Sequence, residues 1–243
     1  MTWVKICGIT NLEDALVAVD AGADALGFVF YEKSPRKVDV ETAREIVSKL
    51  PETVEKVGVF VDGSNPEWLE VLHRAGLTSA QHVKTNSGND EGSRSAVSMS
   101  ALRQPPKLYV SLPLAGFLHD ESQVRALAAD FAKLRKNRPD RSSLPDGVFD
   151  TFFLDSGSGQ QPGGTGQTFD WRKAVSIAEG LRQGGLKLVV AGGLNPDNVA
   201  EAIEVLQPWG VDVSSGVEAR AGKKDPEKVR AFVQAVRRTE KSV

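Results

Sequence analysis

The sequence has few of the residues that build disulfides and metal sites. Its 243 residues include one cysteine, Cys7, and three histidines, which excludes an internal disulfide framework and a CxxC-type metal site. The formal net charge is −2, which gives no electrostatic reason to expect nucleic-acid binding. No apolar run approaches the roughly 18 residues of a membrane span. We therefore expect no metal, no cofactor and no membrane contact, and any anionic ligand must be held by local groups.

The beginning of the chain also lacks the layout of a signal peptide, because its first residues lead directly into a predicted strand. Together with the single cysteine, this predicts a cytoplasmic protein. The composition does not decide between a monomer and a homodimer.

What the sequence does contain is a regular alternation of strand and helix patterns. Strands alternating with helices indicate βαβ units and a parallel sheet, and eight units in this length are typical of a single (β/α)8 TIM barrel over residues 1–243. An open, doubly wound parallel sheet is the alternative. Irregular and mobile structure is expected in the stretches 85–106 and 136–148. The eight predicted strands cover residues 3–7, 25–30, 57–61, 79–83, 108–112, 149–155, 186–191 and 211–213.

The sixth predicted strand ends on a carboxylate, Asp155, and a glycine-rich loop follows it. Neither strand packing nor an ordinary turn requires this combination. In parallel α/β proteins, ligands bind at the carboxyl ends of the strands. Asp155 is therefore a candidate catalytic acid, because apolar neighbours can raise the pKa of a carboxyl group. The alternative is that Asp155 only caps a turn.

Two further glycine-containing loops follow the seventh and eighth predicted strands. Gly192 and Gly193 occur in the first, and Ser215 and Gly216 in the second. In TIM barrels these two loops commonly bind phosphate, because glycine lets free backbone amides approach the anion. The pair predicts a phosphorylated small-molecule ligand, in preference to two simple tight turns.

The single cysteine lies at the carboxyl end of the first predicted strand. Side-chain alternation puts Lys5 and Cys7 on the barrel-facing side. A free cysteine is most often a small buried hydrophobe. At the rim it becomes a candidate base if the following helix start and nearby cations lower its pKa from roughly 8.5. A base and an acid without a metal cluster indicate isomerisation or elimination.

These motifs resemble the phosphoribosylanthranilate isomerase family, and the resemblance spans almost the whole chain, least clearly from about residue 78 to 147. Taken together, the motifs are highly specific. They are Lys5-Ile6-Cys7-Gly8-Ile9-Thr10, Ser34-Pro35-Arg36, Leu154-Asp155, Gly163-Gly164-Thr165-Gly166, Ala191-Gly192-Gly193-Leu194 and Val213-Ser214-Ser215-Gly216-Val217-Glu218.

The resemblance implies an Amadori rearrangement of N-(5-phosphoribosyl)anthranilate in tryptophan biosynthesis. It implies that Asp155 is the general acid and Cys7 the general base. Arg36 matches an arginine near the anthranilate group, and Asp212 matches an acid near the sugar. For Arg36 the alternative is a solvated loop charge, and for Asp212 a turn-capping carboxylate. A flavin- or phosphate-binding barrel with other chemistry, or an inactive relative used in assembly, are the competing functions.

The fourth predicted strand departs from the family pattern, which reads Val-Gln-Leu-His-Gly. This chain reads Ala80-Gln81-His82-Val83-Lys84. If Gln81 keeps its inward place, His82 points to the helix side, because a shift of one residue changes the face. If His82 keeps its place, Gln81 turns outward. We favour the first register and interpret His82 as a structural histidine.

Overall fold

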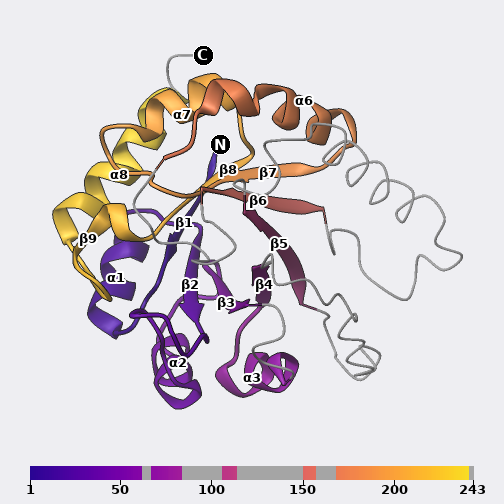
Figure 1. Ribbon diagram of the computed structural model, residues 1–243. Helices are drawn as coiled ribbons and strands as arrows, with labels where there is room; N and C mark the ends of the chain where they lie inside the picture. The colour runs from indigo at the N-terminus through magenta and orange to yellow at the C-terminus, as the bar shows by residue number, and fades with distance from the viewer. Residues whose placement is uncertain (62–66, 84–105, 114–149, 157–167, 241–243) are drawn as a thin grey trace, which may run out of the picture.

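The computed structural model describes residues 1–61, 67–83, 106–113, 150–156 and 168–240, and it contains a closed barrel of eight parallel strands (Figure 1). Each strand pairs with the next, and β1 pairs with β8 to close the barrel. The predicted barrel is confirmed and the open sheet is excluded. The strands are β1 (Trp3–Cys7), β2 (Ala25–Val29), β3 (Glu55–Val61), β4 (Ser79–Val83), β5 (Lys107–Pro113), β6 (Thr151–Asp155), β7 (Lys187–Val190) and β8 (Gly210–Val213).

Helices surround the strands on the outside of the barrel (Figure 1). None of those within the described ranges is long and apolar enough to cross a membrane. They are α1 (Leu12–Asp20), α2 (Val40–Val47), α3 (Trp68–Ala75), α6 (Val175–Gln183), preceded by the 3-10 turn η2 (Trp171–Ala174), α7 (Val199–Leu206) and α8 (Pro226–Thr239).

Side-chain caps fix where several of these helices begin. The side chain of Asn11 accepts a hydrogen bond from the backbone amide of Asp14 at the start of α1. At the start of α8 the side chain of Asp225 accepts from the amides of Glu227 and Lys228, and Pro226 takes the first helical position. At α7, the residue that flanks the first turn is Asn198. The side chain of Asn195 instead accepts from the amides of Asp197 and Asn198 and closes the turn before the helix.

The alternation of each strand separates an outer core from an inner one. The outward side chains form a large cluster with the helices. The inward side chains form a small apolar cluster of Ala25, Val57, Tyr109, Phe153 and Val189, with Trp3 and Trp209 packed against it. The two tryptophan rings stack with centroids 5.1 Å apart. Since Trp3 begins β1, this stack lies toward the amino ends of the strands.

The carboxyl ends of the strands carry additional structure after β8. A 3-10 turn, η3 (Ser215–Val217), leads into a hairpin of β9 (Glu218–Arg220) and β10 (Lys223–Lys224). The hairpin is held to α1, because Asp14 accepts hydrogen bonds from the backbone and side chain of two lysines, Lys224 N at 2.7 Å and Lys223 Nζ at 2.7 Å. The segment after β8 is therefore attached to the beginning of α1.

Several predictions fall outside the described residues. They include the irregular stretches 85–106, except for Pro106, and 136–148, as well as the glycine-rich loop that follows Asp155.

Candidate active site

Cys7 ends β1 on the inner side of the barrel and is buried, with an exposed fraction of 8%. Its partner in the sheet is Gly27 of β2. A Cβ atom added at Gly27 would lie 2.7 Å from Cys7 Sγ and 3.0 Å from Lys5 Nζ. The absence of a side chain at Gly27 therefore makes the space that the thiol and the ammonium group share.

Lys5 and Asp212 form a buried ion pair beside this cysteine. Lys5 Nζ donates to Asp212 Oδ1 at 3.0 Å, and the lysine side chain is completely buried. The two residues are also register partners between β1 and β8. Asp212 therefore lies inside a strand and does not cap a turn, which corrects the alternative interpretation of this residue.

The ionisation of Cys7 differs from the expectation. Burial raises the pKa of the Cys7 thiol above its ordinary value, and Asp212 adds to this effect. Lys5 and Lys224 act in the opposite direction but do not overcome burial. The expected cations are therefore present, while the expected low pKa is not, because the sulfur is removed from water.

Arg36 is not a solvated loop charge. Its Nε and Nη2 atoms donate to the two carboxylate oxygens of Glu218, each at 2.9 Å, in the bidentate geometry that arginine favours. Lys224 Nζ donates to the same carboxylate at 3.0 Å and to the carbonyl of Ser214 at 3.2 Å. The two cations keep the pKa of Glu218 below its usual value although burial opposes this.

Arg36 also lies close to the turn that follows Cys7. Gly8 has a φ angle of +80°, and a Cβ atom there would lie 2.6 Å from Arg36 Cδ and 3.0 Å from Ser214 Oγ. Glycine is therefore required at this position both for backbone conformation and for space. The result is that Cys7, Arg36 and the loop after β8 share one part of the rim.

Asp155 is the last residue of β6 and is half-buried. The register aligns it with Pro113 of β5. The next residue, Ser156, abuts Gly192 so closely that a Cβ atom at Gly192 would overlap it. Asp155 is therefore at the same carboxyl end of the barrel as Cys7 and is adjacent to the loop after β7.

The two predicted phosphate loops are in contact with each other. Gly192 and Gly193 have φ angles of +80° and +66°, and a Cβ atom at Gly216 would overlap the carbonyl of Leu194. Asn198 Nδ2 donates to the carbonyl of Gly193 at 3.0 Å and fixes the first loop. Within the described residues, the buried hydroxyl groups of Ser156 and Ser214 have no hydrogen-bond partner. The loops thus combine close backbone approach with available donors.

His82 points to the helix side, as favoured above. Its ring packs against Phe60, with centroids 5.9 Å apart, and edge-on to Trp68 at 4.8 Å. Gln81, in contrast, is buried between the inward positions of Val59 and Tyr109. This register keeps Gln81 inside the barrel and His82 outside it.

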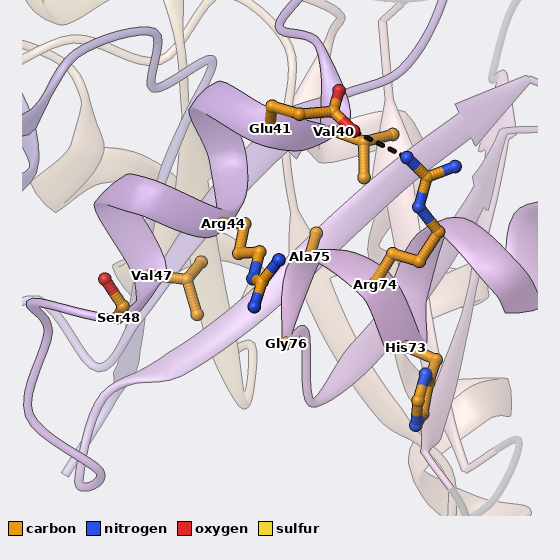
Figure 2. A pocket seen from close by; sticks show the side chains of 9 residues that line it. All are labelled: Val40, Glu41, Arg44, Val47, Ser48, His73, Arg74, Ala75 and Gly76. Carbon is orange, nitrogen blue, oxygen red and sulfur yellow. Dashed lines mark hydrogen bonds and ion pairs between the residues drawn. The ribbon is translucent and has the colours of Figure 1, made fainter.

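A separate groove lies on the outer surface between α2 and α3 (Figure 2). Arg74 forms an ion pair with Glu41 across it, and Arg44 and His73 also line it. It contains none of the predicted site residues. The groove is therefore distinct from the candidate active site.

Sequence reasoning did not assign roles to three buried charged residues at the rim, Lys5, Glu218 and Lys224. The signal for Lys5 was present, since alternation placed a lysine on the same inward face as Cys7. Glu218 ends a motif quoted above, but its partner Arg36 is 182 positions away. No local pattern indicates that Lys224, six positions after Glu218, folds back onto it.

The sequence matches a family model described as N-(5'phosphoribosyl)anthranilate (PRA) isomerase over residues 4–86 and 120–235. A curated relative, the N-(5'-phosphoribosyl)anthranilate isomerase of Geobacter sp. (strain M21), is 40% identical over 239 residues. The aligned region covers 96% of this chain and 97% of the relative.

Solved structures give the same result. The phosphoribosyl anthranilate isomerase of Thermotoga maritima superposes with a TM-score of 0.71 at 35% identity, covering 98% of this chain and 99% of that one. Another solved phosphoribosyl anthranilate isomerase, in complex with reduced 1-(o-carboxyphenylamino)-1-deoxyribulose 5-phosphate, has a TM-score of 0.69 at 34% identity, with coverage of 98% of this chain and 99% of that one.

The raised pKa of Cys7 leads to a prediction for its alkylation by iodoacetamide. Only the thiolate reacts, so below the pKa the rate should rise about tenfold per pH unit. Because burial raises the pKa, this rise should continue beyond roughly pH 8.5, the pKa of a free cysteine. Mass spectrometry of the native protein between pH 6 and 10 measures the rate, and the unfolded protein is the control. The prediction would be contradicted if the alkylation rate of the native protein levelled off at or below the pH at which the unfolded chain reaches half of its maximal rate.

Proposed function

Because the chain belongs to the N-(5'-phosphoribosyl)anthranilate isomerase family, we propose that Cys7 and Asp155 are the base and the acid of its reaction. The activity is the isomerisation of N-(5'-phosphoribosyl)anthranilate in tryptophan biosynthesis. The observation that carries the assignment of roles is the position of both residues at the carboxyl ends of barrel strands, where TIM-barrel enzymes place their catalytic groups.

The reaction begins with opening of the sugar ring. The carboxyl group of Asp155 donates its proton to the furanose oxygen as the bond between that oxygen and C1 breaks. The lone pair of the anthranilate nitrogen forms the C=N bond of a Schiff base with C1. Proton donation by a carboxyl group at this step is general acid catalysis, which typically raises a reaction rate about 10²–10⁴-fold.

The second step moves a proton away from C2. The thiolate of Cys7 takes this proton, and the electrons of the C–H bond form a C1–C2 double bond while the nitrogen becomes neutral. The resulting enolamine then tautomerises, C2 becoming a ketone and C1 gaining a hydrogen. The product is 1-(2-carboxyphenylamino)-1-deoxyribulose 5-phosphate, and no atom is gained or lost overall.

Three groups around the rim are suited to hold the substrate. Gly192, Gly193, Ser215 and Gly216 would bind the phosphate through backbone amides, supported by the contact between their loops. Arg36 would face the anthranilate carboxylate, since its ion pair with Glu218 fixes the guanidinium plane. For Asp212 we propose a position near the sugar, beside Cys7.

We also infer a single-domain protein, working as a monomer or homodimer. A cytoplasmic location is consistent with its single cysteine.

Removing either catalytic group should abolish most of the activity. Cys7→Ser and Asp155→Asn should each lower kcat by about 10² or more, the usual scale for a general base or acid. The assay follows the loss of phosphoribosylanthranilate fluorescence. Asp225→Asn is the matched control, because asparagine also caps a helix well and Asp225 only caps α8. Near-normal turnover in either test variant would refute the role of that residue.

The phosphate loops are tested by a pair of glycine substitutions. Gly193 and Gly22 both have positive φ angles, +66° and +93°, so alanine at either site should cost on the order of 1 kcal/mol of stability. Only Gly193 lies in a proposed phosphate loop. Gly193→Ala should therefore raise KM at least several-fold, while Gly22→Ala leaves KM unchanged. Equal KM values for the two variants would speak against phosphate binding at this loop.

The outward position of His82 predicts a small kinetic effect. His82→Ala removes a ring that packs against Phe60 and Trp68, so it should lower thermal stability. The value of kcat/KM should fall less than tenfold, or below about 1.4 kcal/mol of transition-state stabilisation. Steady-state kinetics beside Asp155→Asn decides this, since a comparable loss would place His82 in the site.

A further inference from the structure

We propose that Lys5 is a positioning residue whose buried ammonium group stabilises the thiolate of Cys7 when this residue takes the substrate proton. The inference deepens the proposed function and rests on the role of Cys7 as the base. Lys5 occupies the inward position two residues before Cys7 on the same strand, and no part of its side chain is exposed.

The geometry brings the two side chains to one point in the barrel. Both Cys7 Sγ and Lys5 Nζ lie over Gly27, at 2.7 Å and 3.0 Å from the place where a Cβ atom would stand. The position of both groups over one glycine makes them neighbours, and the positive charge of Lys5 acts to lower the pKa of the thiol against the effect of burial. A Cβ at Gly27 would displace one of the two groups, so this glycine of β2 preserves their contact.

The charges around the sulfur favour Lys5 as the stabilising cation. Within the described residues, the charged groups with the largest effect on the thiol of Cys7 are Lys5 on β1, Asp212 on β8 and Lys224 on β10, and Arg36 packs against the next residue, Gly8. Lys224 is engaged by Glu218 and by the Ser214 carbonyl, and burial lowers its pKa. The pKa of Lys5, in contrast, is raised. Burial alone would lower it, but the negative charges of Asp212 and of a thiolate at Cys7 outweigh burial, so Lys5 keeps its proton.

A purely structural role accounts poorly for this lysine. Desolvation of two buried charges is costly, and an ion pair inside a protein is often no more stabilising than hydrophobic residues of the same volume. Lys5 Nζ also lies 5.4 Å from the centre of the Phe153 ring, where an apolar side chain would pack as well. What an apolar residue cannot provide is positive charge at the place where the thiolate forms.

The test uses the fact that Cys7 is the only cysteine in the chain, so alkylation by iodoacetamide reports this thiol alone. Lys5→Met removes the charge at similar length. The pH at half-maximal alkylation should rise by about one unit or more, because a nearby cation favours the charged thiolate. The rising limb of the kcat/KM profile should shift equally, and kcat at pH 7.5 should fall about tenfold, with KM changing less.

The matched control is Lys56→Met. Lys56 is also a buried strand lysine, but its Nζ donates to the carbonyl of Pro51 at 2.7 Å, outside the site. It should lose stability without moving the alkylation midpoint. An unchanged midpoint in Lys5→Met, or the same shift in Lys56→Met, would overturn the proposal.

Two variants keep the test decisive if Lys5→Met folds poorly. Lys5→Arg retains the charge and should keep the midpoint near that of the parent protein. Lys5→Met combined with Asp212→Asn leaves no unpaired buried carboxylate, and its midpoint should still be raised, because Lys5 outweighs Asp212 at the sulfur. If the alkylation midpoint of this double variant equalled that of the parent protein, Lys5 would serve only to neutralise Asp212, and the proposal would fail.

The result is separable from the assignment of the base. If Cys7→Ser is inactive and Lys5→Met changes neither the alkylation midpoint nor the kcat/KM profile, only the inference about Lys5 fails. If Cys7→Ser stays active, Cys7 is not the base, and the proposed role of Lys5 in the reaction fails with it.

Discussion

The ion pair between Lys5 and Asp212 is the constraint on which the rest of the site depends. It joins β1 to β8, the first strand to the last, at the seam where the barrel closes. Two charges removed from water are tolerated only with good geometry and complementary partners. Their presence fixes the layer of the barrel directly below Cys7, and it sets the electrostatic environment in which that thiol ionises.

A second buried network lies in the same part of the rim as Cys7 and holds the segment that follows β8. Glu218 accepts from Arg36 and Lys224 at once, and the hairpin that carries Lys224 is attached to α1 through Asp14. The bidentate pair uses Nε and Nη2 of the guanidinium group, so Nη1 is not used in this pair. Under the proposed function, Glu218 orients Arg36 while one edge of the guanidinium group stays directed to a substrate carboxylate.

Local patterns in the sequence predict the parts of the structure that depend on neighbours in the chain. Alternation gave the eight strands within about two residues, put Lys5 and Cys7 on one face and favoured the outward His82, because the side-chain period of a strand is two. The caps at Asn11 and Asp225 are local in the same sense, because each side chain accepts from an amide two or three residues later.

What could not be predicted depends on contacts between residues far apart. Glu218 meets Arg36 across 182 positions of sequence, and no local pattern encodes that meeting. From the sequence, a pKa of Cys7 lowered by the helix start and nearby cations was the condition for its role as base. The cations are there, but the degree of burial, which decides the direction of the shift, follows from closure of the whole barrel.

The interior of the barrel explains why a buried thiol with a raised pKa is compatible with a role as base. Toward the amino ends the inner face is closed by aromatic and aliphatic side chains, so the polar groups have access only to the carboxyl end. Because the thiol of Cys7 is buried, water cannot solvate its thiolate form, and burial therefore raises the pKa of this thiol. The same exclusion strengthens the attraction between a thiolate and a fixed cation, because the effective dielectric constant is low. A base in this position therefore needs a permanent positive charge within reach, and the barrel provides one at Lys5.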